Sequence, residues 1–210
     1  MRLYYNPFSN NSRRAHLTAL LLGVDIELAL VDLPKGEQRQ PLHLQRNPNG
    51  RVPVLDDDGF LLWESRAIMQ YLADKAPGQT LYPSAARPRA DVNRWLFWDA
   101  AHLAPAVGVL TFERFVKRVT GRGDPDPVEV RRGEGLIAQV LPVLDGHLAG
   151  KTWVTSDRMT LADVTLAATL SAAPIAGIDL EPYANVRTWQ ARLRDLEAWK
   201  ATEPPRPPGK

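Results

Sequence analysis

The residues best suited to chemistry lie in two short segments, Asn47-Pro-Asn-Gly-Arg-Val-Pro-Val-Leu55 and Glu64-Ser-Arg-Ala-Ile68. In the first segment, Asn49-Gly50 is typical of a turn, and a proline at position 53 cannot donate to a sheet ladder, so it belongs at an edge or in a cis turn. A cis Val52-Pro53 bond is expected to leave the amide and carbonyl of Val52 facing outward, where they can pair with an extended ligand. This segment therefore predicts a surface that binds a small peptide partly through the backbone.

The second segment predicts that a helix starts at Glu64 and Ser65. A helix start attracts anions through its free N–H groups and its dipole. A simple capping box beginning at Ser65 fails, because the third residue after it is Ile68 rather than Glu or Gln. The mismatch favours ligand binding over a purely structural cap at this position.

The composition restricts the chemistry further. The chain has 210 residues, of which 26 are basic and 24 acidic, for a formal net charge of +2, and it has no cysteine. The lack of cysteine excludes disulfides, thiolate metal sites and a protein thiol as nucleophile. Because no long stripe of like charge is present, neither nucleic acid nor a membrane surface is an expected partner.

One segment superficially matches an export signal. Ser12-Arg-Arg-Ala-His-Leu17 precedes an apolar run, as in a twin-arginine sequence, but the run is short and is followed by Asp25 and Glu27. The segment is better interpreted as an amphipathic helix, and a cytoplasmic location is expected.

The first third of the chain predicts a small α/β domain. Strands are expected at 3–5, 26–31, 54–55 and 60–62, and helices at 12–23 and 64–73. The order βαβ followed by ββα predicts a compact mixed sheet over residues 1–76.

The rest of the chain predicts an all-helical domain. Residues 77–88 are rich in proline and are interpreted as a linker. Helical spacing of apolar residues recurs at 89–119, 128–148, 160–176 and 185–199, which places a helical domain at 89–200 and leaves 201–210 as a disordered tail. Thr160-Leu-Ala-Asp163 predicts a structural cap for the third of these helices, with Asp in place of the usual Glu of a capping box.

Taken together, these motifs resemble the cytosolic glutathione transferases over nearly the whole chain, from Leu3 to about Trp199. The resemblance implies a thioredoxin-like βαβββα domain, a C-terminal helical bundle domain and a homodimer. It is closest to serine-type members of the phi, theta and bacterial classes. The matching segments are Tyr5-Asn-Pro-Phe-Ser-Asn-Asn-Ser-Arg-Arg14, Lys35-Gly-Glu-Gln-Arg-Gln-Pro41, Asn47 to Leu55, Glu64 to Ile68, Thr160 to Asp163 and Tyr183-Ala-Asn-Val-Arg-Thr-Trp189.

The resemblance implies that glutathione binds as co-substrate and that no metal is needed. Ser9 matches the activating serine of the family and is expected to donate a hydrogen bond to the bound thiolate, although Asn10, Asn11 or Ser12 could donate instead. Ser65 is expected to hold the γ-glutamyl carboxylate, Glu64 the ammonium group, and the backbone of Val52 the cysteinyl unit, with Pro53 fixing the geometry. Gln38, Arg39 and Arg51 are candidates for the glycine carboxylate, and Gln38 departs from the histidine that relatives often carry.

The second substrate is expected to be a small apolar electrophile, because aromatic side chains are available to form an apolar wall. The candidates are Phe8 in the first loop and Trp98, His102 and Phe112 in the long helix after the linker. Two other functions stay open: peroxide reduction, isomerisation or dehalogenation at the same site, and a non-catalytic binding protein that keeps the fold.

Overall fold

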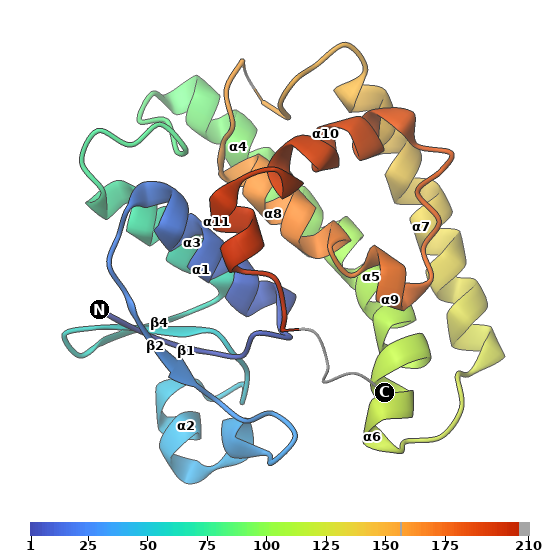
Figure 1. Ribbon diagram of the computed structural model, residues 1–210, viewed down its shortest axis with the longest axis horizontal. Helices are drawn as coiled ribbons and strands as arrows, with labels where there is room; N and C mark the ends of the chain where they lie inside the picture. Colours follow the sequence, from blue (N-terminus) through green and yellow to red (C-terminus); the bar gives the residue numbers. More distant parts are fainter. Residues whose placement is uncertain (156, 206–210) are drawn as a thin grey trace. The chain divides into compact units, whose positions relative to one another are not determined.

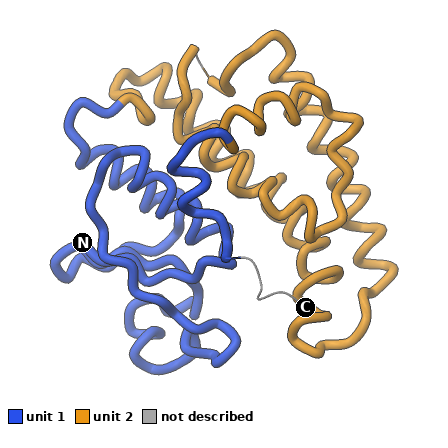
Figure 2. Tube along the Cα trace, in the orientation of Figure 1, with its two compact units in different colours: residues 1–79, 195–210 blue, residues 80–194 orange. Residues whose placement is uncertain are grey.

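The computed structural model describes residues 1–155 and 157–205 (Figure 1). The chain forms two compact units (Figure 2): one combines Met1–Gln79 with the segment from Asp195 onward, and the other spans Thr80–Arg194. No helix among the described residues is both long enough and apolar enough to cross a membrane.

The described part of the first unit is built on one four-stranded sheet with the strand order β2-β1-β3-β4. Strands β1 and β2 run parallel, whereas β1 with β3 and β3 with β4 are antiparallel pairs. The strands are β1 (Arg2–Tyr5), β2 (Glu27–Leu30), β3 (Val54–Asp57) and β4 (Phe60–Trp63). The predicted α/β domain with a mixed, thioredoxin-like sheet is confirmed.

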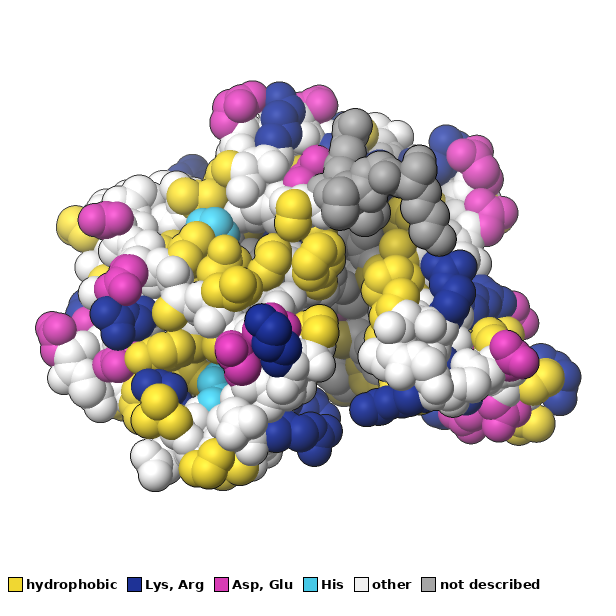
Figure 3. All heavy atoms as spheres, turned by 60° about the horizontal axis from the view of Figure 1, so that its bottom comes forward, with side chains coloured by type: hydrophobic (Ala, Val, Ile, Leu, Met, Phe, Trp, Pro, Cys, Tyr) yellow, Lys and Arg dark blue, Asp and Glu magenta, His cyan; other side chains and the backbone are white. Residues whose placement is uncertain are grey.

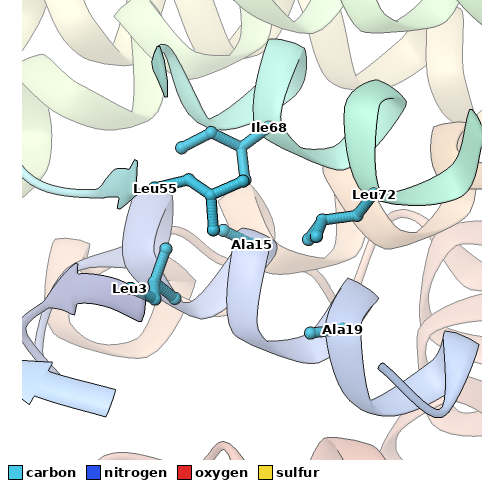
Figure 4. Close-up of a cluster of buried hydrophobic side chains, with 6 residues drawn as sticks. All are labelled: Leu3, Ala15, Ala19, Leu55, Ile68 and Leu72. Carbon is cyan, nitrogen blue, oxygen red and sulfur yellow. The ribbon is translucent and has the colours of Figure 1, made fainter. Parts of the chain in front are cut away.

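Helices α1 (Asn10–Leu22) and α3 (Ser65–Lys75) lie on the same side of this sheet (Figure 1). Their apolar sides meet the central strands in a buried cluster (Figure 4), whose members are Leu3, Ala15, Ala19, Leu55, Ile68 and Leu72. Burying each of the large aliphatic side chains stabilises the fold by about 1.5–3 kcal/mol. The cluster holds both helices against the sheet, and candidate site residues lie at their N-terminal ends.

The connection between β2 and β3 contains two short elements that the sequence did not predict, the 3₁₀ turn Glu37–Arg39 and helix α2 (Pro41–Arg46). Helix α2 lies on the side of the sheet opposite α1 and α3 (Figure 1), and the Arg46 guanidinium stacks on the Tyr4 ring at 4.3 Å. The segment is too short to show helical periodicity, because six residues make fewer than two turns. The connection carries Gln38 and Arg39.

Helix α11 (Glu197–Ala201) groups with the first unit, whereas the sequence assigned residues 89–200 to the helical domain. The cause is Arg13 of α1, whose guanidinium stacks on the Trp199 ring at 4.0 Å and donates to the Trp199 carbonyl at 3.2 Å. Arg13 Nε also donates to Thr202 Oγ1 at 3.3 Å, and Thr202 is buried. The start of the predicted tail 201–210 is therefore packed, and residues 206–210 lie outside the described residues.

The second unit is helical, as predicted, but its helices are more divided. The first predicted helix begins earlier, at Ala86 inside the predicted linker, and contains two π-helical turns, Asp99–Leu103 and Phe112–Val116. The helices are α4 (Ala86–Trp98), α5 (Ala104–Thr111), α6 (Lys117–Thr120), α7 (Pro127–Leu148), α8 (Leu161–Leu170), α9 (Ala173–Ala176) and α10 (Ala184–Arg194).

Helix α8 is buried at every position and begins with the predicted capping box of Thr160 and Asp163, which is confirmed. The Asp163 carboxylate accepts hydrogen bonds from the Thr160 N–H at 2.8 Å, the Val154 N–H at 2.9 Å and the Trp189 Nε1–H at 2.9 Å. Burial raises the pKa of the Asp163 carboxyl, and these hydrogen bonds oppose the shift because they favour the charged form. The cap also ties α8 to α10 and to the loop before it.

Candidate functional site

The loop between β1 and α1 is shaped by Asn6, which is buried. Its side chain donates to the Val31 carbonyl at 2.9 Å and accepts from the Phe8 N–H at 3.0 Å, and its backbone carbonyl accepts from the Ser9 N–H at 3.0 Å. Asn6 therefore fixes the place of Ser9 relative to β1. The sequence signal was the Asn-Pro pair that ends the strand, but its partner Val31 is distant in the chain.

Ser9 is the N-cap residue of α1 and is half-buried. Its Oγ accepts a hydrogen bond from the Ser12 N–H at 3.2 Å, so the structural cap is present. A hydroxyl has one hydrogen to donate in addition to its two lone pairs, and no acceptor for the Ser9 hydrogen occurs within the described chain. Capping the helix and donating to a ligand are thus compatible at this residue.

The other three residues of this turn have different surroundings. Asn10 is the first residue of α1 and half-buried, and Asn11 is exposed, with its Oδ1 accepting from Arg14 Nη1 at 2.7 Å. Ser12 is fully buried, and its Oγ accepts from the Asn6 N–H at 3.2 Å. Ser9 and Asn10 are therefore partly exposed, whereas the Ser12 side chain is enclosed by the loop.

Glu64 and Ser65 begin α3, as predicted. Glu64 is exposed and has a positive φ of 71°, which is unusual for a residue with a side chain. Ser65 is buried, and its Oγ accepts a hydrogen bond of 2.8 Å from Nη1 of Arg14. This nitrogen also bonds to Asn11, so the structure brings the starts of α1 and α3 together.

The Val52-Pro53 peptide bond is cis, as predicted. Both side chains are buried, so they are held by the body of the unit. The N–H and carbonyl of Val52 have no hydrogen-bond partner among residues 1–155 and 157–205. These two groups are available to an extended ligand.

The loop before Val52 is held by His43 and by Asn47, the first residue of the Asn47 to Leu55 segment. The Arg51 carbonyl accepts hydrogen bonds from His43 Nε2 and from Asn47 Nδ2, both at 2.9 Å. Because a carbonyl only accepts, His43 must carry a hydrogen on Nε2. The signal for His43 was absent, since helix α2 itself was not predicted.

Gln38 and Arg39 lie next to this loop, and Arg51 is part of it. Gly50 has φ 60°, and a Cβ atom there would lie 3.1 Å from the Gln38 carbonyl oxygen and 4.0 Å from Arg39 Cγ. The backbone of the turn thus approaches the 3₁₀ turn closely, and glycine permits this. Arg39 and Arg51 are exposed, and Gln38 Oε1 is buried without a hydrogen-bond partner in the described part of the chain.

The aromatic candidates lie in both units. In the first unit, Phe8 is 62% exposed. In the second unit, the Trp98 ring contacts His102 with centroids 6.1 Å apart, His102 is exposed, and Phe112 is 39% exposed beside Lys117. His102 and Phe112 each occupy a π-helical turn, an element often found at functional sites. Their common electrophile pocket stays a prediction.

Among the described residues, no three or more His, Asp or Glu side chains are arranged to hold a metal ion.

Comparisons with known proteins converge on one family. The family model described as glutathione S-transferase, N-terminal domain matches residues 1–74, and the one described as glutathione S-transferase, C-terminal domain matches residues 110–197. A delta-class glutathione transferase from Nilaparvata lugens is 34% identical with a TM-score of 0.83, and the match covers 96% of this chain and 92% of that chain.

Two further solved structures match over almost their full length. A glutathione S-transferase III in its apo form is 33% identical with a TM-score of 0.84, covering 100% of this chain and 99% of that chain. A glutathione S-transferase-I bound with lactoylglutathione is 28% identical with a TM-score of 0.84, covering 96% and 97% respectively.

Proposed function

The chain belongs to the glutathione S-transferase family, and on this premise we propose that its first unit binds reduced glutathione and stabilises the thiolate for attack on a small apolar electrophile. The transferase function predicted from the sequence motifs agrees with the family, whereas membership of a serine-type, phi- or theta-like class stays a prediction. Glutathione is a co-substrate in this scheme, and the proposal requires no metal.

The hydroxyl of Ser9 is the observation that carries the proposal. It is half-buried at the N-terminus of α1, and its hydrogen has no acceptor within the described chain. A free thiol has a pKa near 8.5, and lowering it by two units requires about 2.7 kcal/mol of preferential stabilisation of the anion. A hydroxyl hydrogen bond together with the positive end of a helix supplies an effect of this size.

The remaining candidates fit the other parts of the tripeptide. Ser65 and Glu64 at the start of α3 would bind the γ-glutamyl carboxylate and ammonium groups, and the free backbone groups of Val52 would pair with the cysteinyl unit. Gln38, Arg39 and Arg51 offer polar groups around the neighbouring loop for the glycine carboxylate. Phe8, Trp98, His102 and Phe112 would line the pocket for the electrophile.

The distribution of charged side chains on the surface is compatible with a small-molecule ligand. On the face shown in Figure 3, basic and acidic side chains are interspersed, in keeping with the net charge of +2, and nothing there resembles a basic stripe for nucleic acid.

We also propose a cytoplasmic homodimer. Exposed apolar side chains on β4 and α4, namely Phe60, Leu61, Trp63 and Phe97, support an interface, which light scattering of the purified protein would test.

Conjugation of glutathione to an aryl halide across a pH series tests the proposal. Ser9→Ala should raise the pKa of the bound thiol toward that of free glutathione and lower turnover at neutral pH by about tenfold for each unit of the rise. Ser84→Ala is the matched control, because Ser84 is exposed and lies outside the site.

The results of this assay identify the hydrogen-bond donor and distinguish an enzyme from a binding protein. An unchanged pH profile in Ser9→Ala moves the donor role to Asn10 or another residue of the turn. Tight glutathione binding by the wild type without turnover of any electrophile favours a non-catalytic binding protein.

A further inference from the structure

Arg14 is a buried cation with no role in the scheme above. Only 1% of its surface is exposed, although arginine is rarely buried in proteins. Its Nη1 atom donates to Ser65 Oγ at 2.8 Å and to Asn11 Oδ1 at 2.7 Å. It therefore links the first turn of α1 to the first residue of α3.

The hydrogen bond from Arg14 determines how the Ser65 hydroxyl can act. A guanidinium has only donors, so the Ser65 oxygen must use a lone pair to accept from it. The single hydroxyl hydrogen of Ser65 then remains for another partner, and no acceptor for it occurs in the described part of the chain. Arg14 thus leaves Ser65 oriented as a donor.

The same geometry also places a permanent positive charge next to the start of α3. Arg14 does not deprotonate in proteins, and its charge acts strongly because the surroundings are shielded from water. An anion that accepts from Ser65 and from the N–H groups at the start of α3 would lie near this charge. The combination favours a carboxylate over a neutral group.

We propose that Arg14 is a positioning residue that makes Ser65 selective for the γ-glutamyl carboxylate of glutathione. This inference rests on the proposed function, because it assumes that the tripeptide occupies the start of α3. Arg14 acts through Ser65 and through its charge, not by direct contact with the reacting sulfur. It should therefore govern the affinity for glutathione and leave the pKa of the bound thiol unchanged.

The test compares two ligands by calorimetry on the full-length protein. One is reduced glutathione, and the other is γ-aminobutyryl-cysteinyl-glycine, which keeps the amine and lacks only the γ-glutamyl carboxylate. In Arg14→Met and in Ser65→Ala the affinity for glutathione should fall about 10- to 100-fold, while the affinity for the analogue changes less than about twofold. The double variant should lose little more than either single variant, because the two side chains act as a unit.

Kinetics give a second readout. With saturating glutathione, Arg14→Met should keep the wild-type kcat and pH profile, while its KM for glutathione rises in proportion to the lost affinity. Arg14→Lys should recover part of the preference, because a lysine keeps the charge but its side chain ends one bond short of the position of Nη1. Arg13→Met is the matched control: Arg13 is also buried on α1 but bonds to Trp199 and Thr202, so its loss should lower stability without changing the ratio of the two affinities.

A result against the proposed function and a result against the role of Arg14 can be told apart. A wild type with no affinity for glutathione refutes the proposed function itself. A wild type that prefers glutathione over the analogue, together with a folded Arg14→Met that keeps the same preference, overturns the role of Arg14 alone. Should Arg14→Met not fold, a wild-type preference ratio in Arg14→Lys has the same meaning, since the lysine side chain is one bond shorter and its ammonium cannot reach the position of Nη1.

Discussion

Glu64 has the most unusual backbone conformation among the candidate site residues. Its φ of 71° and ψ of 106° lie outside the regions that residues with a Cβ atom favour. Such a conformation costs about 1–3 kcal/mol and persists only where the surrounding structure enforces it. The next residue, Ser65, is held by its hydrogen bond from Arg14, and Glu64 itself is the residue proposed to meet the ammonium group.

Glycine at position 64 should therefore stabilise the fold relative to alanine. At an ordinary position glycine lowers stability relative to alanine by about 0.5–1 kcal/mol. At this positive φ the order should reverse, with Glu64→Gly more stable than Glu64→Ala by about 1 kcal/mol in urea unfolding. Both variants lack the carboxylate, so both should lose glutathione affinity equally. Equal stabilities would show that the conformation carries no strain.

Short sequence motifs identified part of the candidate site. They did not identify the residues that hold this site in place through hydrogen bonds. Ser9, Pro53 and Ser65 lie in short motifs whose geometry depends on adjacent residues, and for Ser9 and Ser65 the structure agrees in the cap and the helix start. Asn6 and Arg14 were missed because their partners, Val31 and Ser65, are 25 and 51 residues away. A single sequence contains no signal for such hydrogen bonds, and the proposed roles of the site residues stay predictions.

At the scale of elements, the contact between α5 and α7 depends on Gly133. A Cβ atom at this position would lie 2.7 Å from Leu110 Cδ2 and 2.8 Å from Leu110 Cγ. Leu110 is buried, so its side chain has little room to move away. Glycine is needed here for the close approach of the two helices, even though it weakens α7 itself.

Gly133→Ala should lower the free energy of unfolding by about 1–3 kcal/mol, as overpacking of a buried contact does. Gly135→Ala is the matched control on the same helix, because a Cβ atom there would meet no other part of the described chain within 4 Å. That control should raise stability by about 0.5–1 kcal/mol through helix propensity. Chemical denaturation of both variants measures the two changes, and a stabilised Gly133→Ala would contradict the packing argument.

Periodicity predicted the long elements and failed for the short ones. Helices α1, α3 and α7 follow helical spacing over enough residues to be recognised, whereas the four-residue strands were located as short apolar runs bounded by turns. Helix α2 has six residues, and each of the two π-helical turns spans five residues inside one long predicted helix, which is too few to show a period of its own. The break between α8 and α9 at residues 171–172 was missed because Ala-rich sequence continues across it.

At the scale of the whole molecule, the first unit is discontinuous in sequence. Trp199 and Thr202 pack on Arg13, so a segment near the C-terminus completes a unit that begins at Met1. The sequence alone does not indicate this, because the apolar spacing of 185–199 is that of one helix of the helical domain. Arg13 is what recruits the segment, and arginine in an amphipathic helix ordinarily indicates a solvent-exposed face.

An ion pair in each unit should contribute to the resistance of the protein to acid. In the first unit, Lys75 and Tyr71 donate to Asp57 and lower the pKa of its carboxyl below the ordinary 3.8. In the second, Lys117 and the Asp126 N–H lower the pKa of the Glu113 carboxyl below 4.5. A lowered folded pKa means that the unfolded chain takes up the proton first, so each contribution is present above the unfolded pKa and is lost as the pH falls through the folded pKa.

Asp57→Asn tests this titration, because asparagine keeps the size of the side chain and cannot ionise. The variant should be less stable than the wild type above about pH 5, and the difference should shrink as the pH falls below 3.8. Urea unfolding over that pH range measures it. Lys75→Met should show the same pattern, and the double variant should add little, because either change removes the pair. A stability difference that stays constant across the range would mean that Asp57 contributes through packing and not through its charge.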